Sequence, residues 1–224
     1  MIRACLFDLD GTLLDTVTTI AYYGNLALAE FSLPTIETEK YKYLAGNGAK
    51  VLVERMLCEV GAYNDEMFGK VYNYYTKKYN ENVSYLTKPY DGIITMLSAL
   101  KKHNILIGIV SNKPDFATCN VSKQFFEEGL VDVVRGQRDG VAIKPAPDSA
   151  LDVMRELGVD KDETAFIGDT WVDIETGKNL GVFTIGVLWG FRDYDELKSS
   201  GADLIVKTPC EITEYIDMVH NVKE

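Results

Sequence analysis

Two aspartates separated by a single residue, Asp8 and Asp10, follow the apolar run from Ile2 to Leu6 and precede a glycine, Gly11. A carboxylate at the end of a buried strand is unfavourable unless it is paired, bound to a metal or used in a reaction. The two carboxylates therefore predict a site that attracts a cation.

Later in the chain, other polar groups suited to phosphate chemistry follow apolar runs. Ser111 and Asn112 offer a hydroxyl group and backbone N–H groups after the run from Ile105 to Val110. Such groups can form a cradle for a phosphate. Lys144 supplies a compact positive charge that suits phosphoryl oxygens. Lys113, next to the cradle, is predicted to face the solvent.

The last acidic pair follows the apolar run from Thr164 to Ile167. Asp169 comes first, and Asp173 lies one helical turn later, on the same face. Two interpretations of Asp173 stay open. It could orient Lys144 or a metal-bound water, or it could simply be an acidic residue in the first turn of a helix, where the helix dipole favours negative charge.

In their order along the chain, these segments resemble the haloacid dehalogenase superfamily, and the resemblance covers essentially the whole sequence. Most members of that superfamily cleave phosphate esters through an aspartyl phosphate. The segments that resemble its four motifs are Phe7 to Leu13, Ser111-Asn112-Lys113, Lys144-Pro145 and Gly168 to Asp173.

The resemblance implies a role for each polar residue. Asp8 would attack phosphorus as the nucleophile, and Asp10 would protonate the departing alkoxide and then take a proton from the attacking water. Lys144 would be catalytic and would bind phosphate together with Ser111 and Asn112. We therefore expect a small phosphorylated metabolite as the substrate.

The resemblance also implies a Mg²⁺ cofactor. Its ligands would be the Asp8 carboxylate, the backbone carbonyl of Asp10 and the Asp169 side chain, with Asp173 in a supporting role. Magnesium suits carboxylate oxygens combined with water and substrate phosphate. An aspartate at position 10 favours ester hydrolysis, because the dehalogenase and phosphonatase members lack an aspartate two residues after the nucleophile.

The same motifs allow several alternatives. A sugar-phosphate mutase similar to β-phosphoglucomutase would keep both aspartates, and a pyrophosphatase or a broad nucleotide phosphatase of the same superfamily is also open. A non-catalytic, Rossmann-like binding protein is disfavoured because no Gly-x-Gly-x-x-Gly fingerprint follows the first apolar run.

Substrate choice is predicted to depend on Gly46, Asn47 and Gly48. The segment 44–57 around them is similar to the corresponding segment of phosphoglycolate phosphatases, as is the segment 188–192. A glycine-rich loop before a helix could present N–H groups to an anionic substrate, although it could equally be an ordinary turn between helices.

The elements that position these residues follow from short apolar runs that alternate with helical patterns. The runs predict strands at 2–6, 105–110, 131–134, 164–167, 183–187 and 204–206, with helices near 93–100 and 151–157 between them. This alternation predicts an α/β fold with a Rossmann-like, doubly wound parallel sheet. Binding groups in such sheets gather at the carboxyl ends of the strands.

One interval, residues 16–86, contains no convincing strand. Helical patterns near 17–31, 48–60 and 65–82 predict an inserted α-helical cap domain, connected through 88–92 to a catalytic core of residues 1–15 and 87–224. Tyr72, Tyr75 and Tyr79 have helical spacing, so they are predicted to pack within the cap with their hydroxyl groups at the surface.

Composition limits the class of protein. The 224 residues carry a net charge of −11, which argues against binding of nucleic acid. No run is long enough to span a membrane and no secretory signal is evident, so a cytoplasmic location is expected. Four scattered cysteines are expected to be reduced thiols. The sequence does not indicate an oligomeric state.

Overall fold

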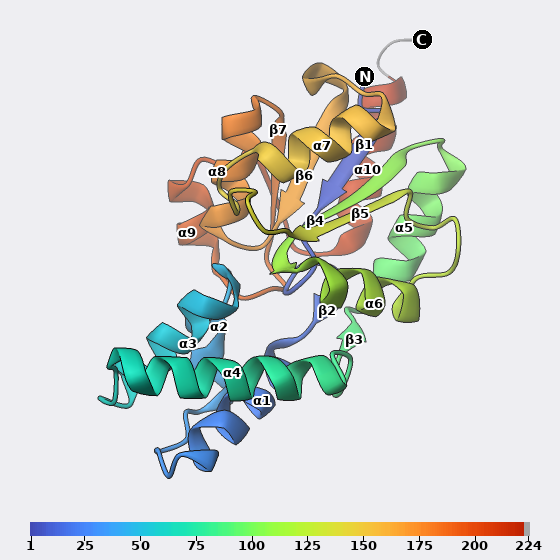
Figure 1. Ribbon diagram of the computed structural model, residues 1–224. Helices are drawn as coiled ribbons and strands as arrows, with labels where there is room; N and C mark the ends of the chain where they lie inside the picture. The colour runs from blue at the N-terminus through green and yellow to red at the C-terminus, as the bar shows by residue number, and fades with distance from the viewer. Residues whose placement is uncertain (222–224) are drawn as a thin grey trace.

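A six-stranded parallel sheet forms the centre of the molecule in the computed structural model, which describes residues 1–221 (Figure 1). Its strand order is β5-β4-β1-β6-β7-β8. The strands are β1 (Ala4–Phe7), β4 (Leu106–Pro114), β5 (Val133–Gln137), β6 (Thr164–Gly168), β7 (Phe183–Val187) and β8 (Leu204–Val206). The predicted α/β fold with a doubly wound parallel sheet is confirmed.

The strands form where apolar residues are buried on both faces of the sheet. Every residue of β1 is buried, and β1 pairs in parallel with β4 on one side and β6 on the other. Strands covered on both faces have continuous apolar sequences instead of alternating ones. The main difference from the prediction is β4, which continues four residues beyond Val110, through three polar residues to Pro114.

Helices cover both faces of the sheet. Buried side chains of α5 (Ile93–Lys102), α6 (Asp115–Phe125) and α10 (Pro209–Asn221) pack with those of Phe7 and Ile107. On the opposite face, α7 (Asp148–Leu157) and α8 (Trp171–Leu180) pack with Leu6 and Phe166. The helix α9 (Tyr194–Ser199) places Leu197 against Gly186 on this second face.

The interval between β2 (Leu14–Asp15) and β3 (Lys88–Pro89) is helical. It contains α1 (Val17–Glu30), η1 (Thr38–Lys40), α2 (Tyr41–Leu44), α3 (Gly48–Glu59) and α4 (Asp65–Glu81). These helices lie beyond one end of the sheet (Figure 1). The short strands β2 and β3 pair antiparallel, so both connections to the helical segment run side by side.

The three long helices predicted in this interval are present within a residue at each end, whereas η1 and α2 are additional. Among the described residues, no helix is long and apolar enough to cross a membrane.

Candidate active site

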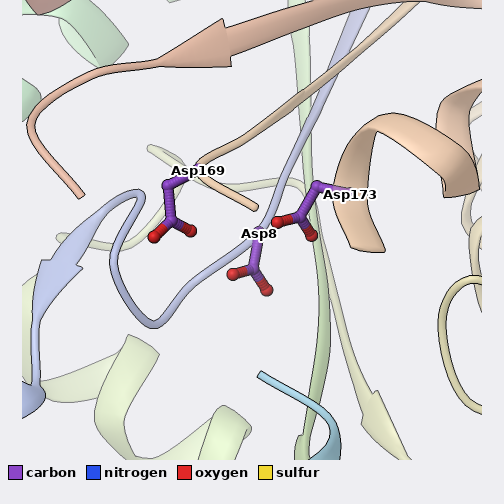
Figure 2. Close-up of side chains that lie close together, drawn as sticks. All are labelled: Asp8, Asp169 and Asp173. Carbon is purple, nitrogen blue, oxygen red and sulfur yellow. The ribbon is translucent and has the colours of Figure 1, made fainter. Parts of the chain in front are cut away.

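Three buried carboxylates converge at the carboxyl ends of adjacent strands. Asp8 follows β1, Asp169 follows β6, and Asp173 lies in the first turn of α8 (Figure 2). One carboxylate oxygen from each residue lies within 4.8 Å of the others. The sheet topology causes this convergence, because β1 and β6 are neighbours in the sheet.

A single lysine lies between two of these carboxylates. The Lys144 Nζ donates hydrogen bonds to Asp8 Oδ1 at 2.6 Å and to Asp173 Oδ1 at 2.7 Å. Its side chain is 3% exposed, so water cannot replace these partners. Counting three carboxylates against one ammonium group leaves an excess of two negative charges in a buried site.

Burial makes this excess unfavourable and alters the pKa values of the acidic groups. Burial raises the pKa of Asp8 to about 7 even though Lys144 acts in the opposite direction. The pKa of Asp169 lies well above its ordinary value, because of burial first and then the charges of Asp173 and Asp8. Burial alone would lower the pKa of Lys144, but Asp173 and Asp8 outweigh it and raise that pKa.

The surroundings of these residues fit a hard divalent cation. Asp169 is oriented by hydrogen bonds from the Thr12 hydroxyl at 3.1 Å and from the Phe191 backbone N–H at 2.7 Å. Carboxylate oxygens held in this way are the ligands that such cations prefer. A divalent cation would also balance the two excess negative charges.

Two glycines permit the close packing of the acidic residues. Gly11 has a φ of +95°, and a Cβ atom there would lie 2.3 Å from Asp169 Oδ2. A Cβ atom on Gly168 would lie 2.1 Å from the Cβ atom of Asp173. Any side chain at either position would therefore displace a carboxylate of the site.

The predicted phosphate cradle lies beside Asp8. Ser111 is buried in the cavity wall on β4, with its hydroxyl 3.3 Å from the backbone N–H of Lys113. The Asn112 side chain donates to the backbone carbonyls of Gly46 at 3.0 Å and Lys144 at 3.1 Å, and it accepts from the Lys144 N–H at 2.8 Å. The Asn112 side chain thus holds Lys144 and the glycine loop in place.

The expectation that Lys113 faces solvent is wrong. Its side chain is 4% exposed, and its Nζ lies 2.9 and 3.2 Å from the two carboxylate oxygens of Asp10. Because β4 continues to Pro114, Ser111 and Lys113 are both buried in the wall of the same cavity. Asp10 therefore faces Lys113 and stands outside the group of three carboxylates.

The expectation that the tyrosine hydroxyl groups lie at the surface is also wrong for Tyr75 and Tyr79, whereas Tyr72 is half-buried. Tyr75 and Tyr79 on α4 are buried, and their rings stack with centroids 5.5 Å apart. The Lys113 Nζ donates a hydrogen bond to the Tyr79 hydroxyl and lies 4.9 Å from the ring centroid. Both tyrosines line the cavity, and Tyr79 links α4 to the end of β4.

One cavity joins the acidic site to the helical segment. Its wall contains Asp8, Asp10, Ser111, Asn112, Lys113, Lys144 and Asp173 together with Gly46, Gly48 and side chains of α1, α3 and α4. The structure places Gly46 and Gly48 in this wall, whereas Asn47 is not among the described residues that line it. Residues two apart in a strand share one face, so the position of Lys113 two residues after Ser111 was the sequence signal that could have placed it in the site.

The chain is similar to known phosphatases over nearly its full length. The sequence profile of the haloacid dehalogenase-like hydrolase family matches residues 5–187. The chain is 31% identical over 215 residues to the phosphoglycolate phosphatase of Aquifex aeolicus, with 96% of this chain and 97% of that protein covered. It is 29% identical over 231 residues to the N-acetylmuramic acid 6-phosphate phosphatase of Pseudomonas aeruginosa, with 96% and 95% covered.

A solved structure has the same fold. It is that of a Lactobacillus delbrueckii subsp. bulgaricus protein described as a candidate phosphoglycolate phosphatase, with a TM-score of 0.91 and 29% identity. The match covers 96% of this chain and 98% of that one. Sequence and fold agree with the four motifs: the chain belongs to the haloacid dehalogenase-like hydrolase family.

Proposed function

We propose that the protein is a magnesium-dependent phosphatase that hydrolyses small phosphomonoesters through an aspartyl phosphate. The observation that carries this proposal is the convergence of Asp8 with Asp169, Asp173 and Lys144 at the ends of neighbouring strands. Asp8 is a buried carboxylate next to the ammonium group of Lys144. The neighbouring acidic pair can attract a cation, and a nucleophile that attacks a phosphate needs both kinds of positive charge nearby.

In the first proposed step, the Asp8 carboxylate attacks phosphorus. An oxygen–phosphorus bond to Asp8 forms, the bond to the leaving oxygen breaks, and protonated Asp10 gives its proton to that oxygen. In the second step, water attacks the same phosphorus and gives a proton to Asp10. Phosphate leaves, and the Asp8 carboxylate is restored.

The other residues hold charge and orientation during both steps. Lys144 keeps its proton and faces the phosphoryl oxygens beside Asp8, while Ser111 and the backbone N–H groups near it donate hydrogen bonds. Asp8, Asp169 and the Asp10 carbonyl are the proposed magnesium ligands. Magnesium, when bound, supplies positive charge that lets a carboxylate and a phosphate approach each other.

Residues 16–86 are proposed to act as a cap over a catalytic core of residues 1–15 and 87–224. The paired strands β2 and β3 lie where the chain enters and leaves the helical segment and would serve as hinges. Closure of such a segment excludes water from the reaction and completes the contacts to the substrate.

The test is phosphate release from an aryl phosphate with magnesium, before and after the change Asp8→Asn. The amide has nearly the same shape but cannot attack phosphorus, so we expect a loss on the order of 10³-fold or more. Asp91→Asn, which changes an exposed aspartate outside the site, is the matched control. Retention of most activity by folded Asp8→Asn protein would refute the mechanism.

The same assay separates the alternatives. A hexose phosphate that is isomerised without release of phosphate would indicate a mutase, and preferential cleavage of pyrophosphate would indicate a pyrophosphatase.

A further inference from the structure

We propose that the protein selects phosphomonoesters whose leaving alcohol carries no charge, and that it discriminates against leaving groups with a carboxylate, such as glycolate. The inference rests on the proposed function and names the substrate class of the same site. It follows from the charges and contacts in the part of the cavity wall that would face the leaving group.

The helical segment contributes an uncharged wall. Within residues 16–86, all of which the structure describes, no charged side chain lines the cavity. The side chains of this segment in the wall include Ile20, Leu52, Tyr75, Thr76, Tyr79 and Asn80. A leaving group that enters this region therefore loses water without gaining an ionic partner from the cap.

The core supplies two cations to the described cavity wall, and both are already paired. Lys144 is held between Asp8 and Asp173. Lys113 contacts both carboxylate oxygens of Asp10 and the Tyr79 hydroxyl. A substrate carboxylate would therefore have to displace a contact that one of these lysines already makes.

The sum of charges also disfavours a second anionic group on the substrate. The three carboxylates of Asp8, Asp169 and Asp173 are just balanced by Lys144 and a divalent cation, so the phosphate group by itself already leaves the site with a net negative charge. An unpaired carboxylate in an apolar wall is strongly unfavourable. The N-terminus of α3, at Gly48, lines the cavity, but a helix terminus carries only about half a positive charge.

An alcohol with an apolar face and hydroxyl groups fits this wall better. The stacked rings of Tyr75 and Tyr79 lie beside aliphatic side chains, which suits the C–H face of a sugar or polyol. The Asn80 amide can bond to hydroxyl groups, and the Thr76 hydroxyl, which donates to the Tyr72 carbonyl, can accept from one. The leaving group indicated by this chemistry is therefore a neutral sugar or polyol.

The decisive comparison uses two substrates that differ in charge and little in shape: phosphoglycolate and its amide. With magnesium present, we expect kcat/KM for the amide to exceed that for phosphoglycolate by about tenfold or more, because like charges placed together are unfavourable. If turnover of either compound is too slow to measure, both are tested as inhibitors of aryl phosphate hydrolysis, and the amide should then have the lower inhibition constant.

A second experiment introduces a positive charge into the part of the cavity wall formed by the helical segment. Thr76→Lys should raise kcat/KM for phosphoglycolate relative to the amide by about tenfold or more compared with Thr76→Met, which has similar length and no charge. Thr95→Lys adds the same charge on an exposed position of α5 and should leave the ratio of the two substrates unchanged.

Equal or better use of phosphoglycolate by the wild type would overturn the inference. So would a Lys113→Met variant that loses phosphoglycolate turnover selectively, because Lys113 would then be the partner of the substrate carboxylate. Failure of the proposed function would be recognised separately. In that case the protein would not hydrolyse an aryl phosphate, which carries no carboxylate, in the presence of magnesium.

Discussion

Replacing Asp8 with asparagine should stabilise the metal-free protein while it removes turnover. The pKa of Asp8 is raised from 3.8 to about 7. That difference of about three pH units corresponds to ~4 kcal/mol of stability lost when the buried group ionises. The attraction between Lys144 and Asp8 is already included in that raised pKa, and Lys144 keeps Asp173 as a partner in the variant. A net stabilisation of up to ~4 kcal/mol is therefore expected.

The stabilisation that Asp8→Asn produces must increase as the pH rises. Asp8 is an acid whose folded-state pKa lies above its unfolded value, so the fold favours the protonated form. Its contribution to stability is fully present below the unfolded pKa of 3.8 and is lost as the pH rises to about 7. The advantage of Asp8→Asn should therefore be small near pH 4 and reach its full size above pH 7.

Thermal unfolding in excess chelator measures this difference. A stabilisation of ~4 kcal/mol corresponds to a rise of roughly 8–16 °C in Tm for a chain of this size, which is the upper limit of the expected effect. Asp91→Asn controls for loss of an exposed negative charge. The reasoning is refuted if Asp8→Asn protein melts at a lower temperature than the wild type at pH 8, or if the difference between them is the same at pH 5 and pH 8.

Three further predictions concern the metal, the second lysine and the glycine loop. Magnesium should raise Tm more at pH 8 than at pH 5, because it binds Asp8 and Asp169 in their deprotonated forms; an equal rise at both values would show that these groups do not bind it. Lys113→Met should lower kcat for an aryl phosphate by about tenfold or more, since Asp10 loses the partner that positions it, and Lys113→Arg should retain more activity; an unchanged kcat in Lys113→Met protein would assign the ion pair to stability alone. Changes at Gly46, Asn47 or Gly48 should alter the ranking of phosphoesters more than hydrolysis of an aryl phosphate. Measured kcat/KM values that fall equally for all substrates would make this loop a structural or general closure element.

The main strands could be predicted because each is a short apolar run that is buried on both faces. The same rule missed the end of β4, where Ser111, Asn112 and Lys113 continue the strand although they are polar. Their burial depends on the cavity and on the helical segment above it, which a local pattern does not reveal. The pair β2 and β3 was missed because two residues in each strand carry no periodic signal.

The acidic site was predictable for a different reason. Groups that follow parallel strands meet at one edge of the sheet, so chain order alone indicated that Asp8, Ser111 and Asp169 would be neighbours. The contacts of Lys113 and Tyr79 could not be predicted in this way, since they join β4 to a helix more than thirty residues away. Tyrosine spacing indicated one helix face but not the surface that this face would meet.

The same balance of charges that favours binding of a cation also determines which leaving group the site accepts. Asp8, Asp169 and Asp173 exceed Lys144 by two negative charges in a buried site, so binding of a divalent cation relieves an unfavourable state that the fold itself creates. Once the cation balances the excess carboxylate charge, an entering phosphate dianion leaves the site with a net negative charge. A further carboxylate on the leaving group would add more uncompensated charge beside Tyr75 and Tyr79. A neutral leaving alcohol adds none, and the uncharged wall of the helical segment is suited to bind it.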